Sequence, residues 1–229
     1  MPTNSPDQQV TTPNGPDAAV APQDFLDFLA DVETRLVKRY VDEADRTARN
    51  PAPPNGEFSF LAAPGRFDRR QAGVWMEAYP LFVRKATETQ VVNASTVFVN
   101  DSHLVLPVQV NGVYDVSGLW VYDSGTTADI KWQWTAPAGA TMPRWTVQGL
   151  DNAVGTQVGN FSAVPGAALT STMTRNGAGI GTFVAVRMTG LLVVAGTAGN
   201  LQLQWAQNAS EAVNTRMKTD SWLRLDRVG

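Results

Sequence analysis

Short apolar or alternating runs recur along the chain from Leu81 onward, with turn-forming residues such as Asn100-Asp101 and Asn111-Gly112 between them. Strands have this length and spacing, whereas a helix would show an apolar stripe at every third or fourth residue. About nine such runs without a helical period predict two antiparallel sheets packed as a β-sandwich. We therefore expect a mainly β fold, jelly-roll-like in residues 81–229.

The alternation within these runs identifies the side chains expected in the core. Trp132 and Trp134 are two residues apart and so face the same side of their strand. Buried aromatics are the usual filling of a sandwich, although an exposed set could stack on sugar rings or line a subunit interface. The residues predicted to be buried are Val97, Val99, Leu104, Leu106, Trp120, Trp132, Trp134, Leu203, Trp205 and Leu223.

Residues 1–22 contain five prolines and no aromatic side chain. Such a segment buries too little apolar area to offset the entropy lost on ordering. It is either a disordered tail or an extended arm that becomes ordered on a partner surface.

The next segment, Asp24 to Ala48, has the pattern of an amphipathic helix. Asp24 suits its N-cap, and basic residues follow in its second half, as the helix dipole favours. This helix packs either on its own domain or on another protein. Its apolar stripe, the expected contact with a particle or with other copies, comprises Phe25, Leu29, Val32, Leu36 and Tyr40.

Residues 50–56, rich in proline, end this helix, and aromatic residues around a Pro64-Gly65 turn follow. They predict a short β-hairpin that packs on something, since an isolated hairpin is marginally stable. The expected organisation is an arm (1–22), a helix with a small hairpin for attachment (23–80) and a β-sandwich (81–229).

Composition narrows the function. The chain carries 18 Lys and Arg against 21 Asp and Glu, a net charge of −3, and this argues against a nucleic-acid partner. The absence of cysteine and the presence of one histidine exclude disulfides, thiolate sites and multi-histidine metal sites. The first 20 residues do not resemble a signal peptide, and no apolar stretch is long enough to span a bilayer. We expect a protein made in a cytosol, with no cofactor and no membrane partner.

Catalytic patterns are also missing. His103 would have to be the base of any Ser-His-Asp triad, but it lies where a turn is expected to meet a strand. The glycine-rich stretch 177–181 precedes a strand, not the helix of a phosphate loop. A glycosidase would need two carboxylates across one cleft, and no calcium-loop spacing is present. The candidates for such a carboxylate pair are the four acids in the first half of the β domain, Asp101, Asp115, Asp123 and Asp129. We predict a non-enzymatic protein with no catalytic, metal or cofactor residues.

Two groups of segments carry a resemblance to a known family. The first group is residues 35–40 (RLVKRY), 44–51 (ADRTARNP) and 56–60 (GEFSF). The second group is residues 128–132 (ADIKW), 135–142 (TAPAGATM), 190–193 (GLLV) and 197–208 (TAGNLQLQWAQN). They resemble, in that order, the N-terminal attachment module and the recurrent β domain of virion proteins from tailed phages that infect actinobacteria. The resemblance spans roughly residues 25–229 and is carried by turns and strands, so it implies no catalytic residue.

The family comprises minor tail, head-fibre and capsid decoration proteins. The resemblance implies a homotrimer that contacts other virion proteins, major capsid or tail proteins, after assembly in the bacterial cytoplasm. We favour a head fibre or decoration protein, because a proline-rich arm can lie in the grooves between capsid subunits. The alternatives are a minor tail fibre protein and a carbohydrate-binding module that recognises a host surface glycan.

Overall fold

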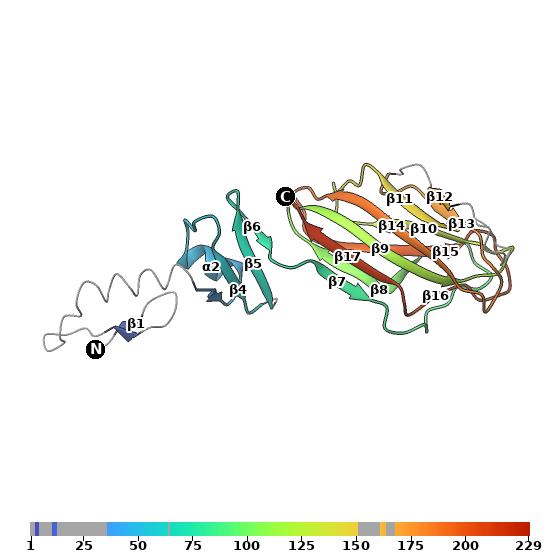
Figure 1. Ribbon diagram of the computed structural model, residues 1–229, viewed down its shortest axis with the longest axis horizontal. Coiled ribbons are helices and arrows are strands. Elements are labelled where there is room, and N and C mark those ends of the chain that lie inside the picture. Colours follow the sequence, from blue (N-terminus) through green and yellow to red (C-terminus); the bar gives the residue numbers. More distant parts are fainter. Residues whose placement is uncertain (1–2, 5–10, 13–35, 64, 151–160, 164–167) are drawn as a thin grey trace, which may run out of the picture. The chain divides into compact units, whose positions relative to one another are not determined.

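The computed structural model describes residues 3–4, 11–12, 36–63, 65–150, 161–163 and 168–229. The chain divides into two compact units, Met1–Tyr79 and Pro80–Gly229. Antiparallel pairing dominates both, and the predicted mainly β fold with an antiparallel sandwich is confirmed (Figure 1).

The smaller unit contains a four-stranded sheet, where the sequence had predicted only a hairpin. The strand order is β3-β4-β5-β6; β3 runs parallel to β4, and the other pairs are antiparallel. The elements are β1 (Thr3–Asn4), β2 (Thr11–Thr12), β3 (Lys38–Tyr40), α2 (Glu43–Arg49), β4 (Phe58–Leu61), β5 (Arg66–Gln71) and β6 (Val74–Glu77).

A single helix from Asp24 to Ala48 is wrong, because residues 38–40 form strand β3 and α2 begins only at Glu43. Residues 24–35 lie outside the described part. The reason for the late start is a reciprocal cap. The Asp42 carboxylate accepts a hydrogen bond from the backbone N–H of Asp45 (2.9 Å), and the Asp45 carboxylate accepts one from Val41 (2.9 Å). This arrangement, which resembles a capping box, starts a helix at residue 43 and leaves the preceding residues free to pair with β4.

The larger unit is a sandwich of two sheets. One is four-stranded, in the order β13-β10-β15-β8, and the other is seven-stranded, in the order β12-β11-β14-β9-β17-β7, with β16 paired to β9. The strands are β7 (Leu81–Arg84), β8 (Val99–Val108), β9 (Val113–Asp123), β10 (Ile130–Thr135), β11 (Trp145–Leu150), β12 (Phe161–Ala163), β13 (Met173–Arg175), β14 (Val184–Val193), β15 (Gly199–Gln207), β16 (Arg216–Met217) and β17 (Trp222–Arg227).

Consecutive strands alternate between these sheets from β7 to β11, and again from β13 to β15. This crossing of the chain between two layers is the connectivity of a jelly roll. Each strand therefore turns one face to the other sheet and one face outward, which produces the alternating burial seen along β8, β9 and β10.

Tryptophans fill the space between the sheets. The ring centroid of Trp120 on β9 lies 5.1 Å from that of Trp132 and 5.8 Å from that of Trp134, both on β10. Eight of the ten predicted core residues are buried, and Val99 is half-buried against the core. Val97 was predicted wrongly: it precedes β8 and is 72% exposed.

A buried ion pair accompanies this apolar core. The ammonium of Lys85, which directly follows β7, lies 2.8 Å from the carboxylate of Asp101 on β8, and both side chains are fully buried. The Asp101 carboxylate also accepts hydrogen bonds from the Trp205 indole (3.0 Å) and from the backbone N–H groups of His103 and Leu104. The predicted turn at Asn100-Asp101 is therefore wrong, because both residues lie within β8.

Strand β8 is an edge of the four-stranded sheet, and a side chain covers part of that edge. The Gln90 amide donates to the carbonyl of Asn100 (2.6 Å) and accepts from the N–H of Ser102 (3.1 Å). Further along, Pro107 has no N–H to offer. Both features block the addition of another strand.

Replacing Lys85 with methionine should lower the free energy of unfolding by about 3–5 kcal/mol, since Asp101 would become a buried charge without a counter-ion. Urea unfolding followed by circular dichroism measures this. The double variant Lys85→Met/Asp101→Asn removes the charge as well and should recover part of the loss. A double variant less stable than Lys85→Met would contradict this role of the pair.

A second prediction concerns pH. A hydrogen bond from Lys218 lowers the pKa of Glu88, assisted by the N–H and hydroxyl of Thr219, although burial opposes the shift. Because the folded pKa is below the unfolded one, the stabilisation is present at neutral pH and is lost as the pH falls through the folded pKa. Glu88→Gln should therefore lower the melting temperature at pH 7, and its difference from wild type should shrink below about pH 4.

The exposed pair Arg224–Asp226 supplies the control, because such pairs contribute little to stability. Asp226→Asn should leave the melting temperature at pH 7 nearly unchanged. A Glu88→Gln deficit that persists undiminished to about pH 3 would contradict the assignment to this carboxyl.

Candidate functional site

The small sheet has an unusual distribution of side chains, with charges on its covered face. Arg46 of α2 donates to the Asp68 carboxylate on β5 (2.6 Å) and to the Ser59 hydroxyl on β4 (3.0 Å). Its guanidinium also lies 4.2 Å from the ring centroid of Trp75 on β6. All but Trp75 are buried, so polar contacts hold the helix to the sheet.

Arg66 extends this network. Its guanidinium contacts Asp68 (2.6 Å) and Glu43 (2.6 Å), with Glu77 at 3.7 Å. Burial alone would lower the pKa of Arg66, but the hydrogen bonds and charges of these carboxylates raise it above its usual value. The inner face therefore combines paired charges with the buried side chains of Tyr40 and Leu61.

The opposite face of the same sheet is apolar and open. We call it the phenylalanine face; it comprises Phe58, Phe60, Phe67 and Val74, with Tyr79 beside it. Phe58 and Phe67 are each 43% exposed, and Val74 is 45% exposed. The rings of Phe60 and Phe67 lie 4.8 Å apart, and Tyr79 meets Phe67 edge-on at 6.2 Å. Exposed apolar surface of this kind marks an interaction site.

Two cations adjoin this face. Arg39 on β3 is the register partner of Phe60, and Arg69 on β5 is the register partner of Phe58. Both are exposed, and the outward positions of β3 to β6 carry no acid. The face thus suits a partner that is apolar with acidic groups at its margin.

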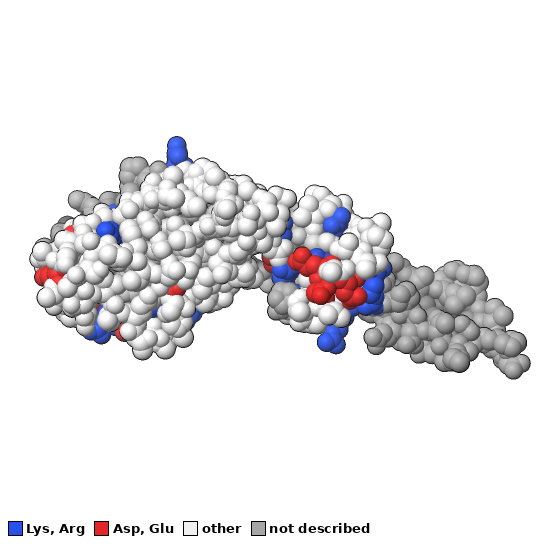
Figure 2. Space-filling view, turned by 180° about the vertical axis from the view of Figure 1, so that it is seen from behind, with Lys and Arg blue, Asp and Glu red and all other residues white. Residues whose placement is uncertain are grey.

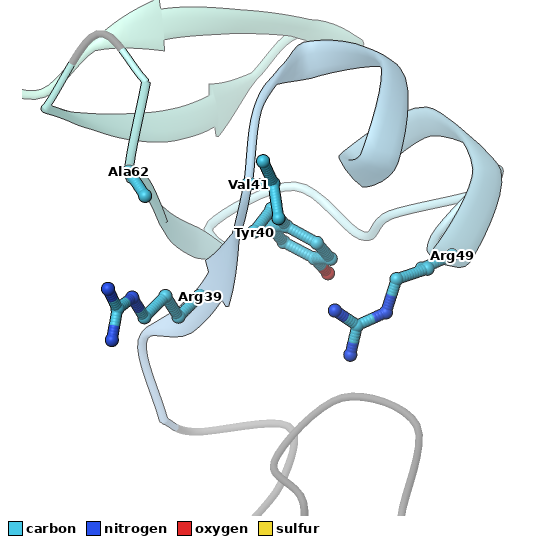
Figure 3. Close-up of a pocket in the computed structure, with 5 residues that line it drawn as sticks. All are labelled: Arg39, Tyr40, Val41, Arg49 and Ala62. Carbon is cyan, nitrogen blue, oxygen red and sulfur yellow. The ribbon is translucent and has the colours of Figure 1, made fainter.

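Arg39 also lines a pocket of about 210 Å³ (Figure 3). The other lining residues are Tyr40, Val41, Arg49 and Ala62. Arg49 lies over the Tyr40 ring, 5.5 Å from its centroid, and has Asp45 at 3.6 Å. The lining is cationic and apolar, so this pocket could hold an acidic side chain of a partner.

The structure describes only two of the five residues of the predicted attachment stripe, Leu36 and Tyr40. Phe25, Leu29 and Val32 lie outside the described residues. Leu36 is 45% exposed, but Tyr40 is buried (1%) in strand β3. Tyr40 therefore belongs to the interior of the small unit and not to a helical contact surface. The sequence predicted that these aromatics pack on the large domain or on a partner, but it did not indicate which side chains of the sheet face outward.

The candidate catalytic residues of the larger unit that the structure describes do not form a triad. Ser102 and His103 are hydrogen-bonded to each other (Oγ to Nδ1, 2.9 Å). Neighbouring Asp101 points into the core toward Lys85 instead of toward this histidine. A triad needs the carboxylate to orient the imidazole, and this one does not.

The glycine-rich stretch 177–181 is not a phosphate loop. The N–H of Gly177 donates to Asp129 (2.9 Å), and that of Gly181 donates to Asp123 (3.0 Å). A Cβ on Gly177 would lie 2.1 Å from the Gly125 carbonyl, so packing explains this glycine. Carboxylates already occupy the donors that a phosphate would need. Among the described residues, no cluster of three or more His, Asp or Glu could hold a metal.

All seven tryptophans are within the described part, and none is exposed. Trp132, Trp134 and Trp145 are between 0% and 3% exposed, which closes them to a sugar ring. Trp75 and Trp222 are half-buried. The hypothesis that Trp132, Trp134 and Trp145 form a glycan-stacking surface is therefore wrong.

No family model matches this chain, and no curated protein matches it. Among solved structures, it is similar to the VP2 subviral particle of infectious bursal disease virus, with 9% identity and a TM-score of 0.20 over 71% of this chain and 48% of that one. It is also similar to a chain in the structure of the Gx strain of the same virus, with 9% identity and a TM-score of 0.18 over 71% of this chain and 44% of that one. The chain spans less than half of either matched chain.

The fold and its surface define a two-unit, mainly β protein whose candidate site is an apolar docking face. In the part of the chain that the structure describes, no helix combines the length and hydropathy needed to cross a bilayer.

The small sheet buries its charged side chains and exposes its phenylalanines, so substitutions at the neighbouring residues Phe67 and Asp68 of β5 should differ in their effect on stability. Asp68→Asn should strongly destabilise the unit, by about 3–5 kcal/mol, because Arg46 and Arg66 would lose a buried counter-ion. Phe67→Ser should cost less, since that ring is partly in water already. Hydrogen exchange of the amides of β4 to β6 in the full-length chain measures both. Faster exchange in Phe67→Ser than in Asp68→Asn would contradict the assignment of the faces.

Proposed function

We propose that this protein is a non-enzymatic structural component of a bacteriophage virion, a trimeric head fibre or capsid decoration protein. In this proposal its N-terminal unit binds the particle and its β-sandwich faces outward. The observation that carries the proposal is the phenylalanine face, an open apolar surface on a small unit that is held together by paired charges. The proposal of a non-enzymatic role is also supported by the β-sandwich, in whose described residues we find no catalytic arrangement.

The sequence supports the phage assignment through the resemblance of residues 35–60 to a phage attachment module. Those residues include β3, α2 and most of β4, and α2 contributes Arg46 and Glu43 to the charged side of the small sheet. The surface that they support is apolar with Arg39 and Arg69 beside it. A capsid or tail protein that presents apolar residues with acids around them would complement it.

The distribution of charge agrees with two different roles for the units. On the side shown in Figure 2, charged side chains are sparse over the larger unit and gather on the smaller one. A weakly charged sandwich suits side-by-side packing of copies, and three copies joined this way would present three docking faces together. The three docking faces of one trimer would then bind the particle more tightly than one face alone. Once the first contact has formed, the second and third form at high effective concentration.

A minor tail fibre protein is the alternative that the same surface favours, since a tail protein can offer the same kind of partner. Glycan recognition would have to use side chains other than Trp132, Trp134 and Trp145, because these three are buried.

Particles test the proposal directly. Phages that encode Phe58→Asp/Phe67→Asp should assemble but lose most of this protein, because two carboxylates would be desolvated against an apolar, acidic partner. Deletion of residues 1–22, or Phe25→Asp/Leu29→Asp, tests the predicted contribution of the arm and stripe in the same way. Quantitative gels of purified particles measure the copy number, and separated capsids and tails distinguish the two locations.

The exposed Val97→Asp in the larger unit is the matched control and should keep the wild-type copy number. Each variant must keep the melting temperature of the wild type. Full retention of both the Phe58→Asp/Phe67→Asp and the deletion variants would show that attachment lies in the β-sandwich instead.

A further inference from the structure

The outward face of the seven-stranded sheet carries apolar side chains on the four neighbouring strands β7, β17, β9 and β14. Trp222 on β17 is the register partner of Leu119 on β9, and the Phe82 ring on β7 lies 5.8 Å from that of Trp222. Phe82 is 58% exposed, and Leu191 on the neighbouring strand β14 is 46% exposed. We call this surface, Phe82, Leu119, Leu191 and Trp222, the β9 face.

The outward face of the four-stranded sheet differs from it. Amides cover its centre: Gln133 donates to Gln204 (2.5 Å), and Gln204 donates to Asn100 (2.8 Å). Water hydrates these amides favourably, so this face is stable in solvent without a partner protein. Of the two outward sheet faces of this unit, the β9 face therefore gains more from burial.

The charges on the β9 face have both signs. Arg224 and Asp226 pair with each other at 3.2 Å. Asp115 stands beside Asp226 as its register partner, and Arg187 stands beside Leu119. Neither Asp115 nor Arg187 forms an ion pair with another described residue. A second copy of the same face brings an arginine for each unpaired aspartate, whereas a purely acidic or purely basic partner would leave like charges together.

We propose that the β9 face is the contact between copies of this chain around a threefold axis, with Phe82, Leu119 and Trp222 at its apolar centre and Arg187 of each copy opposite Asp115 of the next. The inference rests on the proposed function in one respect, the association of three copies. It adds the surface that joins them, on the sheet that contains β7, β17, β9 and β14. The amide-covered sheet then remains in solvent.

Sedimentation velocity of the purified full-length chain tests this. The molecular mass of the wild type obtained from its sedimentation should be three times the 24.7 kDa of one chain. Phe82→Asp should shift the protein toward monomer, raising the dissociation constant by more than about tenfold, because it buries a carboxylate at the centre of the contact. Val97→Asp, which changes an apolar residue that is 72% exposed just before β8 of the other sheet, should leave the oligomer intact. The far-UV circular dichroism spectra of both variants should match the wild type, which shows that Phe82→Asp loses association and not the fold.

Charge reversal adds a reciprocal test. Asp115→Arg should weaken association, and Asp115→Arg/Arg187→Asp should restore it, because the ion pair is rebuilt with opposite polarity. No rescue by the double variant would overturn the proposed pairing.

The outcomes separate this inference from the proposed function. A trimer that survives Phe82→Asp would overturn the β9 face and leave trimerisation standing. A monomeric wild type at tens of micromolar would overturn both the contact and the trimer, while the particle assay would still decide attachment independently.

Discussion

The Asp101 carboxylate joins the two layers of the larger unit. Lys85 reaches it from the end of β7 in the seven-stranded sheet, and the Trp205 indole reaches it from β15 in the four-stranded sheet. Its second oxygen accepts from backbone N–H groups of its own strand. A charge so placed is tolerable only when all its partners are present, so the two sheets must close together and in one register.

This pair also shows where sequence reasoning stops. Strand spacing was sufficient to predict the sandwich, and the two-residue spacing of Trp132 and Trp134 placed both on the inner face. Asn100-Asp101 has the composition of a turn, however, and only a distant lysine, Lys85, makes a strand position favourable for the aspartate. Local propensity cannot indicate a counter-ion sixteen residues away. The same limitation applies to Val97, whose apolar character alone predicted burial.

The small unit was harder to predict, because its pattern is inverted. Alternation of Phe67 and Asp68 normally places the aromatic inside and the acid in water. Here Arg46 and Arg66 pair with the acid, so the phenylalanine is left outside. One signal was present in the sequence: Asp42 and Asp45 have the spacing of a capping box, which limits the helix to residues after 42. Of the predicted site residues that the structure describes, Leu36 is exposed because it precedes β3, whereas Tyr40 is buried because it lies on the inner face of that strand.

The amide of Gln90 on the edge of β8 has a consequence for assembly. By holding the carbonyl of Asn100 and the N–H of Ser102, it occupies the groups through which a strand from another molecule would extend the sheet, and Pro107 offers no donor beyond them. Growth by strand addition has no natural end, since each added molecule presents a fresh edge. With the β8 edge closed, strands cannot be added on that side of the four-stranded sheet, whereas copies that associate through their faces around a rotation axis form an assembly of a finite number of subunits.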